Sequence, residues 1–167
     1  SPDTFPGRLP RRPFCCPGVA DLLAFRTVRV LLPSPAAQFL TSSPTDLSRA
    51  AELLRAGYCV ALPTETVYGL AADALNPSAL AQVFTIKGRP LLDPLIVHVL
   101  DQAALADVAE PDERLALLAS FWPGPLTVVL RRKACVPDLV TASKPTVAVR
   151  IPAHPVFREV LRLCGRP

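Results

Sequence analysis

Beyond the first quarter of the chain, apolar and polar residues alternate with the periods of short helices and short strands. Leucine and alanine recur at helical spacing in residues 45–57, where Thr45 is a predicted cap and Gly57 a predicted C-terminal stop. Residues 58–62 and 94–100 are β-rich apolar runs that predict buried strands. A helix followed by a strand therefore opens the patterned region.

The same pattern continues between and after these two strands. Residues 76–88 predict a second helix, because Asn76 can cap it, Pro77 suits its first turn and Gly88 would end it. Two more short helices are expected to open at Asp101 and at the PDERLALLASF segment.

The last third of the chain adds two strands and a helix. Strands are predicted at residues 125–132 and 146–152, and an amphipathic helix at 154–165. Mixed alternation of strands and helices predicts an α/β or α+β domain, with helices packed on a sheet. The length suits one such domain, which we expect at residues 45–167.

Residues 1–44 lack this periodicity and contain eight of the 20 Pro. An Arg-rich, acid-poor N-terminus is typical of an organelle transit segment. So much Pro argues against the amphipathic helix of such segments, and favours a disordered leader or a mistranslated upstream region. Both interpretations stay open, and both place the folded domain after this segment.

Charge and composition exclude several classes of protein. Residues 1–49 carry six Arg and three Asp, whereas residues 50–167 carry twelve basic and eleven acidic groups, so +3 of the net +4 lies in the first segment. A nearly neutral core argues against a dedicated nucleic-acid binder, which usually shows a basic face. The longest apolar stretch, residues 30–45, is interrupted by three Pro, so no membrane span is predicted.

The five Cys form no CxxC pair and no metal-ligand spacing, so they predict free thiols in a reducing compartment. The sequence also lacks a phosphate loop, a dinucleotide fingerprint, a nucleophile elbow and an HExxH motif. The sequence has only two His, His98 and His154, so few residues are available for a Ser-His-Asp or Cys-His catalytic site. An enzyme on this chain would work mainly by positioning its substrates and neutralising charge.

Lys87 and Arg89 are the first candidates for that task. They flank Gly88 between a predicted helix and a predicted strand. A Lys point charge and an Arg fork together suit phosphate or carboxylate, and Gly88 lets the backbone approach a ligand. A solvated pair of basic residues, favoured by the helix dipole, would explain the same sequence. These three positions by themselves therefore do not distinguish a ligand site from a solvated helix end.

Other candidate side chains follow or interrupt predicted strands. Thr64 and Thr66 can bind a ligand or cap the turn around Pro63. Arg150 lies in the apolar TVAVRIP run, where a charge is costly unless it meets an anion or a partner acid. His98 in LIVHV is either a ligand group or a satisfied core histidine. Basic residues at 131–133 are interpreted as a solvated turn, with phosphate contact as the alternative.

Four segments resemble one family when they are taken together and in order. They are PTETVYGL, KGRP with PLIVHV, WPGPLT and TVAVRIP. They resemble the YrdC-like family, whose best-known members are threonylcarbamoyl-AMP synthases, and the match runs from about Ala50 to the C-terminal end. The resemblance implies a twisted, mixed β-sheet flanked by helices around a positively charged cavity.

The resemblance also implies a reaction. L-threonine, bicarbonate and ATP would form threonylcarbamoyl-adenylate and pyrophosphate, with Mg²⁺ on the phosphates. A partner, the tRNA threonylcarbamoyl transferase, would then modify adenosine 37 of tRNA, so contact with tRNA or other RNA is also expected. The threonine amine captures bicarbonate or CO₂, and the resulting carbamate attacks the α-phosphate, so no protein nucleophile is required.

Residue roles follow from the matching motifs. Thr66 and His98 would contact threonine, and Arg150 would clamp its carboxylate. Lys87 and Arg89 match the family's KxR motif and would be the catalytic charges that face the ATP phosphates. No residue is assigned as a metal ligand.

On the ATP side, Thr146 would contact the nucleotide, and Asp93 stands where the family usually has Asn. A carboxylate at Asp93 would repel phosphate unless Mg²⁺ or Lys87 compensates, so weaker ATP binding is expected. The family also continues, after the equivalent of GRP, into a strand and an SxN motif. This sequence contains no SAN, so part of the sheet and of the site is expected to be missing.

Three alternatives remain at this point. A domain for double-stranded RNA or tRNA is disfavoured by the near-neutral core and by 6% aromatic residues. A carbamoyl-adenylate-forming domain of hydrogenase maturation proteins would carry other modules upstream. A truncated, non-catalytic isoform would lack the SxN segment. A cytoplasmic location is expected, or a mitochondrion or plastid if residues 1–44 are a transit segment.

Overall fold

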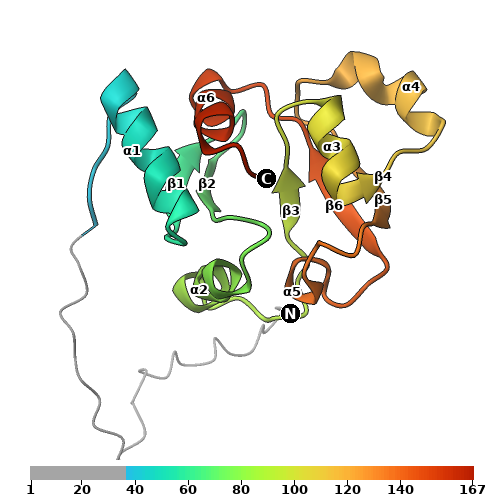
Figure 1. Ribbon diagram of the computed structural model, residues 1–167, viewed down its shortest axis with the longest axis horizontal. Coiled ribbons are helices and arrows are strands. Elements are labelled where there is room, and N and C mark those ends of the chain that lie inside the picture. The colour runs from blue at the N-terminus through green and yellow to red at the C-terminus, as the bar shows by residue number, and fades with distance from the viewer. Residues whose placement is uncertain (1–36) are drawn as a thin grey trace, which may run out of the picture. The chain divides into compact units, whose positions relative to one another are not determined.

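The computed structural model describes residues 37–167, so the predicted leader lies mainly outside the described residues. Helices and strands alternate along the chain (Figure 1), which confirms the predicted α/β class. The elements are α1 (Pro44–Arg55), β1 (Val60–Pro63), β2 (Tyr68–Ala71), α2 (Pro77–Lys87), β3 (Ile96–His98), α3 (Gln102–Val108), β4 (Ala109–Glu110), α4 (Arg114–Leu118), a 3-10 turn (Ala119–Phe121), β5 (Thr127–Arg132), α5 (Asp138–Thr141), β6 (Thr146–Arg150) and α6 (Pro155–Cys164).

Four strands form a mixed sheet in the order β3-β6-β5-β4. β6 is parallel to β3 and antiparallel to β5. Because parallel strands end at the same edge of a sheet, the ends of β3 and β6 meet, and the register places His98 beside Arg150. Two residues that are far apart in the sequence are thus neighbours at this edge.

The remaining two strands, β1 and β2, form a separate antiparallel hairpin. Within residues 37–167 no ladder hydrogen bond joins the hairpin to the four-stranded sheet. In Figure 1 the last residues of the chain run between β2 and β3, and the backbone N–H of Ala74 donates to the carbonyl of Pro167 at 3.0 Å. Side-chain contacts must therefore hold the hairpin against the sheet.

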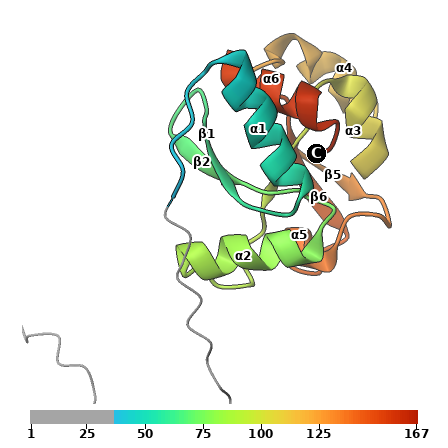
Figure 2. The same ribbon diagram turned by 60° about the vertical axis from the view of Figure 1, so that its left-hand side comes forward.

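The core lies in two clusters that match these two units. One cluster packs under the four-stranded sheet and includes Val97, Val149 and Leu130. The other joins α1, α6 and the hairpin through residues such as Leu54 and Phe157. Figure 2 shows α1 and α6 side by side over the hairpin. Burial of these apolar side chains is the main force that closes both units.

Several predicted helix ends are confirmed. The Asn76 side chain caps α2 by accepting from two backbone N–H groups, and Asp101 caps α3 by accepting from Ala104 N at 2.9 Å. Gly88 and Gly165 end α2 and α6 with φ of +57° and +66°, a left-handed conformation that favours glycine.

The predicted cap of α1 is wrong by two residues. Ser43, rather than Thr45, is the cap, and its Oγ accepts from Asp46 N at 3.2 Å. The physical reason is Pro44, which has no N–H to lose and whose fixed φ suits the first helical position.

Three short elements were not predicted: β2, β4 and α5. β2 is only four residues long and contains Gly69 and Ala71, which carry little strand propensity of their own. Pairing with β1 makes it a strand, so its conformation is decided by tertiary contact.

Candidate functional site

A cavity of about 310 Å³ lies where the hairpin, α2, β3 and α6 meet. Most of its lining is apolar, with side chains such as Leu62, Val83 and Phe157. Its charged and polar lining side chains are few and come from five separate segments: Thr64, Asp73, Lys87, Arg89, His98 and Arg166. An apolar cavity with a small number of converging polar groups is the usual form of a small-molecule site.

Lys87 and Arg89 both line this cavity, as the KGR motif predicts. Lys87 is the last residue of α2, and the left-handed Gly88 turns the chain so that Arg89 N donates back to Phe84 O at 3.0 Å. The turn therefore carries two positive side chains from the end of one helix to the same cavity.

Arg89 is already engaged by a carboxylate of its own loop. Its Nε lies 3.1 Å from Asp93 Oδ2, and its Nη2 donates to the carbonyl of Pro94 at 3.4 Å. Both side chains are partly exposed, 35% for Arg89 and 52% for Asp93. The sequence predicts Lys87 or Mg²⁺ as the group that offsets Asp93, whereas in the structure that group is Arg89. Asp93 itself does not line the cavity.

The loop between β1 and β2 is organised by Thr64. Its hydroxyl donates to Val67 O at 2.6 Å and accepts from the backbone N–H groups of Thr66 and Val67, both at 3.2 Å. Thr64 lines the cavity, whereas Thr66 is exposed and does not. Thr64 therefore caps the turn, as one of the two interpretations predicts, and it also faces the cavity.

His98 lines the cavity from the end of β3. Its ring lies against Phe157 of α6, with centroids 4.9 Å apart, and its Nδ1 is 3.3 Å from Ile96 O. Burial lowers the pKa of His98 below its usual 6.5, the Ile96 hydrogen bond opposes this, and the charge of Arg150 lowers the pKa further. His98 is therefore a neutral imidazole at pH 7.

Arg150 meets a partner acid, one of the two options that the sequence leaves open. Its Nη2 donates to Glu65 Oε2 at 2.5 Å, and the two side chains are 12% and 18% exposed. The other carboxylate oxygen of Glu65 accepts from the backbone N–H of Ala153. Burial by itself would raise the pKa of Glu65, but the hydrogen bonds from Ala153 and its own N–H, together with Arg150, hold it below its usual value.

Glu65 is a residue that the sequence analysis missed. It stands between Thr64 and Thr66 in the PTETVYGL motif, and an Arg in an apolar strand calls for an acid. That signal points to the need for a partner but does not say which of the acidic residues meets it.

Thr146 and Arg150 lie at opposite ends of β6, roughly 13 Å apart at the rise of an extended strand. Neither side chain lines the cavity. The structure thus brings Lys87, Arg89 and His98 to one cavity. Arg150 lies beside His98, and Thr146, Thr66 and Asp93 lie outside the lining.

A second missed pair joins the hairpin to the end of α6. Asp73, whose side chain is 1% exposed, accepts from Arg166 Nη1 at 2.8 Å and from Leu75 N at 2.9 Å. Both Asp73 and Arg166 line the cavity, so the basic group at this position is already neutralised.

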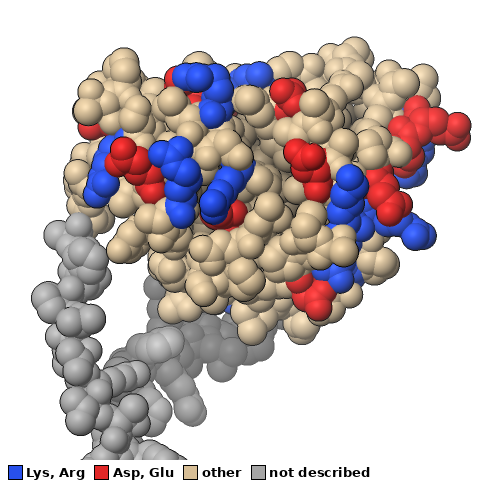
Figure 3. All heavy atoms as spheres, in the orientation of Figure 1, with Lys and Arg blue, Asp and Glu red and all other residues tan. Residues whose placement is uncertain are grey.

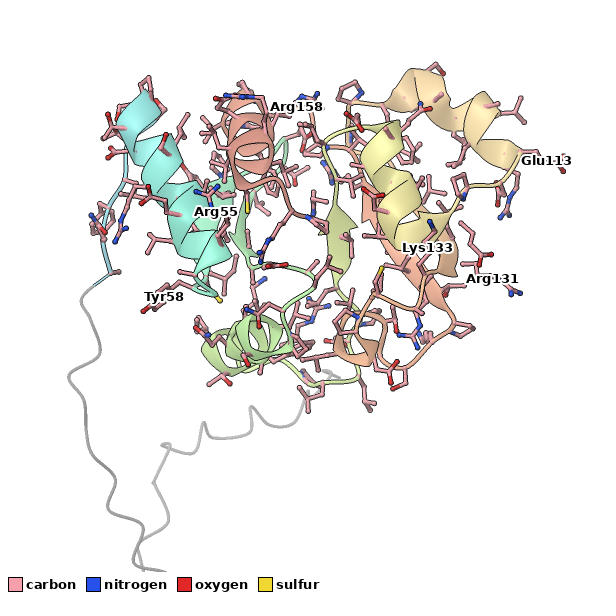
Figure 4. All side chains as sticks on the ribbon, viewed as in Figure 1. Arg55, Tyr58, Glu113, Arg131, Lys133 and Arg158 are labelled. Atoms are coloured by element: carbon pink, nitrogen blue, oxygen red, sulfur yellow. The ribbon has the colours of Figure 1, made fainter. Side chains whose placement is uncertain are left out.

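The basic residues at 131–133 lie away from the cavity, as Figure 4 shows for Arg131 and Lys133. Arg131 lies 3.7 Å from Glu110 and Arg132 lies 2.5 Å from Asp138. On the face in Figure 3, positive and negative side chains are interspersed. This segment is thus an ion-paired strand end.

Two further features of the described residues are their possible metal ligands and the apolar length of their helices. In residues 37–167, Cys59, Cys135 and Cys164 are free thiols. The same residues contain no group of three or more His, Cys, Asp or Glu that could hold a metal ion. None of the helices in this range is long and apolar enough to cross a membrane.

Comparison with known proteins supports the resemblance. The family model Sua5_yciO_yrdC, described as telomere recombination, matches residues 52–167. Threonylcarbamoyl-AMP synthase of Pyrococcus abyssi is 46% identical over 120 residues, which cover 71% of this chain and 35% of that protein. The Bacillus subtilis enzyme of the same name is 42% identical over 134 residues, 77% of this chain and 38% of that protein. The chain thus spans somewhat more than a third of the length of these relatives.

Solved structures agree with the fold. P. abyssi Sua5 complexed with L-threonine has a TM-score of 0.72 and 42% identity, covering 78% of this chain and 38% of that one. Escherichia coli YciO, at 24% identity and a TM-score of 0.66, covers 72% of this chain and 60% of that one and is similar in fold. Motifs, fold and relatives all agree, and the chain belongs to the Sua5/YciO/YrdC family.

Proposed function

We propose that this chain forms the site in which L-threonine, bicarbonate and ATP become threonylcarbamoyl-adenylate and pyrophosphate. One observation carries the proposal: a single cavity is lined by Lys87 and Arg89 and also by Thr64 and His98. Two relatives named threonylcarbamoyl-AMP synthase, and a homologous structure with bound L-threonine, support the same reaction.

The reaction needs alignment more than it needs a protein nucleophile. The threonine nitrogen attacks CO₂ and loses a proton to give a carbamate, or it attacks bicarbonate and water leaves. A carbamate oxygen then attacks the α-phosphate of ATP, and the bond to the β-phosphate breaks as pyrophosphate leaves. Negative charge grows on the phosphates, and Lys87 and Arg89 are the catalytic charges that would stabilise it.

Threonine would bind on the His98 side of the cavity. A neutral imidazole at His98 accepts or donates one hydrogen bond without adding charge, and Arg150 beside it would hold the substrate carboxylate. Thr66 would contact threonine after a small movement of its exposed loop, and Thr146 would contact the nucleotide from the far end of β6. In this proposal the two substrates would lie at opposite ends of one strand.

Mg²⁺ would enter bound to the ATP phosphates and would keep several waters, as it usually does in sites of this kind. Asp73 is the carboxylate that the described residues contribute to the cavity lining, and Arg166 already neutralises it. We therefore assign Mg²⁺ no protein ligand, and its chemistry would be charge neutralisation on the phosphates.

The product would pass to a tRNA threonylcarbamoyl transferase, with transient contact to tRNA. We place the reaction in the cytoplasm, or in a mitochondrion or plastid if residues 1–44 direct the chain there.

The test is threonine-dependent pyrophosphate release from ATP by the purified full chain, with Mg²⁺ and bicarbonate. We expect release to require both threonine and bicarbonate, and Lys87→Ala to reduce it about 100-fold. Lys144→Ala, at an exposed position, is the charge-matched control and should retain full release. A folded chain that binds both substrates and releases no pyrophosphate would instead be the non-catalytic isoform.

A further inference from the structure

Glu65 makes the contact that connects the hairpin loop to the end of β6. Its carboxylate contacts Arg150 Nη2 at 2.5 Å through one oxygen and the Ala153 N–H through the other. Glu65 and Arg150 are separated by 85 residues, and both side chains are largely buried. Both carboxylate oxygens are engaged, so the side chain is held at two points.

This contact bridges two parts of the fold, the β1–β2 hairpin and the four-stranded sheet. No ladder hydrogen bond joins the hairpin to the four-stranded sheet within residues 37–167. Thr64, next to Glu65, lines the cavity from the hairpin, and His98, next to Arg150 in the sheet, lines it from β3. The ion pair therefore fixes the distance between two walls of the cavity.

The contact also leaves part of the guanidinium unused. Glu65 takes a single N–H of Arg150, at Nη2, while Nε is buried and makes no hydrogen bond with the described residues. A buried polar group without a partner is rare and requires an explanation. Since Arg has five donors in a rigid plane, fixing one of them by Glu65 sets the direction of the others.

We propose that Glu65 is a positioning residue: it holds the Arg150 guanidinium in one orientation beside His98, so that the remaining N–H groups bind the carboxylate of an amino-acid substrate. The inference rests on the proposed function, because it takes threonine from that proposal as the amino-acid substrate. Glu65 itself does not touch the substrate and acts through Arg150.

Threonine binding to the full chain, measured by calorimetry, tests this role without requiring catalysis. Glu65→Gln keeps the size and one carbonyl acceptor but removes the charge that fixes Arg150. We expect its threonine Kd to rise about 10- to 100-fold, because a binding group that is held out of position weakens its interaction by about that factor. The Kd for a non-hydrolysable ATP analogue should stay within about twofold, since a general loss of structure would weaken both ligands.

Two further variants sharpen the result. Glu65→Asp keeps the charge on a shorter side chain and should recover part of the threonine affinity. Asp138→Asn removes a carboxylate that lies 2.5 Å from Arg132 in the neighbouring strand, and it should leave both affinities unchanged. This second change is the control for loss of an ion pair made by an Arg of the same sheet, here with the first residue of α5.

The outcomes separate the inference from the function. If the wild-type chain binds no threonine, the proposed function fails and the inference with it. If the wild type binds threonine and Glu65→Gln binds it equally or more tightly, the function stands and the positioning role is overturned. If the Glu65 variants do not fold, NMR of the wild-type chain tests the positioning role instead. Comparison with the spectrum of Arg150→Lys then identifies the signal of the Arg150 guanidinium. Slow rotation of the Arg150 guanidinium before threonine is added supports the role, and free rotation refutes it.

Discussion

Asp93 offers the sharpest test of how the KGRPLLDP loop handles charge. Its carboxylate lies 3.1 Å from Arg89 Nε, so an ATP phosphate and Asp93 would compete for the same guanidinium. Asp93→Asn removes the negative charge and keeps a carbonyl that can still accept from Arg89. We therefore expect Asp93→Asn to bind ATP more tightly than the wild type.

The size of the effect follows from the exposure of the pair. Partly exposed ion pairs are worth about 0.2–1 kcal/mol, and Arg89 and Asp93 are 35% and 52% exposed. A phosphate roughly 8 Å from Asp93 would be repelled by about 1 kcal/mol at an effective dielectric constant of about 40, and salt would reduce this repulsion. The two contributions together come to about 0.2–2 kcal/mol, and the middle of this range, about 1 kcal/mol, is roughly fivefold in Kd.

The assay is calorimetric titration of the full chain with Mg²⁺ and a non-hydrolysable ATP analogue, at low and at high salt. Glu113→Gln is the control, because it makes the same change of charge at the outer end of α4, away from the α2 end of the molecule (Figure 4). An unchanged or weaker affinity in Asp93→Asn would refute the reasoning and show that Asp93 does not act on the nucleotide.

Three further predictions concern stability. Leu130→Ala should lower the free energy of unfolding by about 2–5 kcal/mol in chemical denaturation, because Leu130 is 2% exposed in the core. Val129→Ala, on the exposed face of the same strand, should cost less than about 0.5 kcal/mol, and equal losses would contradict the assigned register. Asn76→Ala should cost about 1 kcal/mol by removing the α2 cap, whereas Ser78→Ala should not, as thermal melting would show. The pKa of His98 is depressed by burial, so below pH 6.5 the unfolded chain binds more protons and stability falls. His98→Gln should flatten this loss between pH 7 and 5, and an unchanged pH profile would exclude His98 as its source.

Local signals in the sequence located many of the element boundaries. Asn76, Asp101 and Gly88 mark helix ends that depend on nearby backbone groups only, and the structure confirms them. Where a competing local signal was present, as with Pro44 before Thr45, the predicted boundary moved by two residues. The strand β2 was missed because its stability comes from its partner strand.

The candidate site divides in the same way. The sequence determined that Lys87 and Arg89 flank a turn, that His98 and Arg150 lie within apolar strands, and that the four motifs resemble one family. The tertiary structure alone decided that Glu65 is the acid that meets Arg150, and that Arg89, rather than Lys87, meets Asp93. The physical reason is that caps and turns are satisfied within a few residues, whereas ion pairs between distant residues depend on strand order and register. Strand order and register depend on how the whole core packs, and no local sequence pattern specifies either of them.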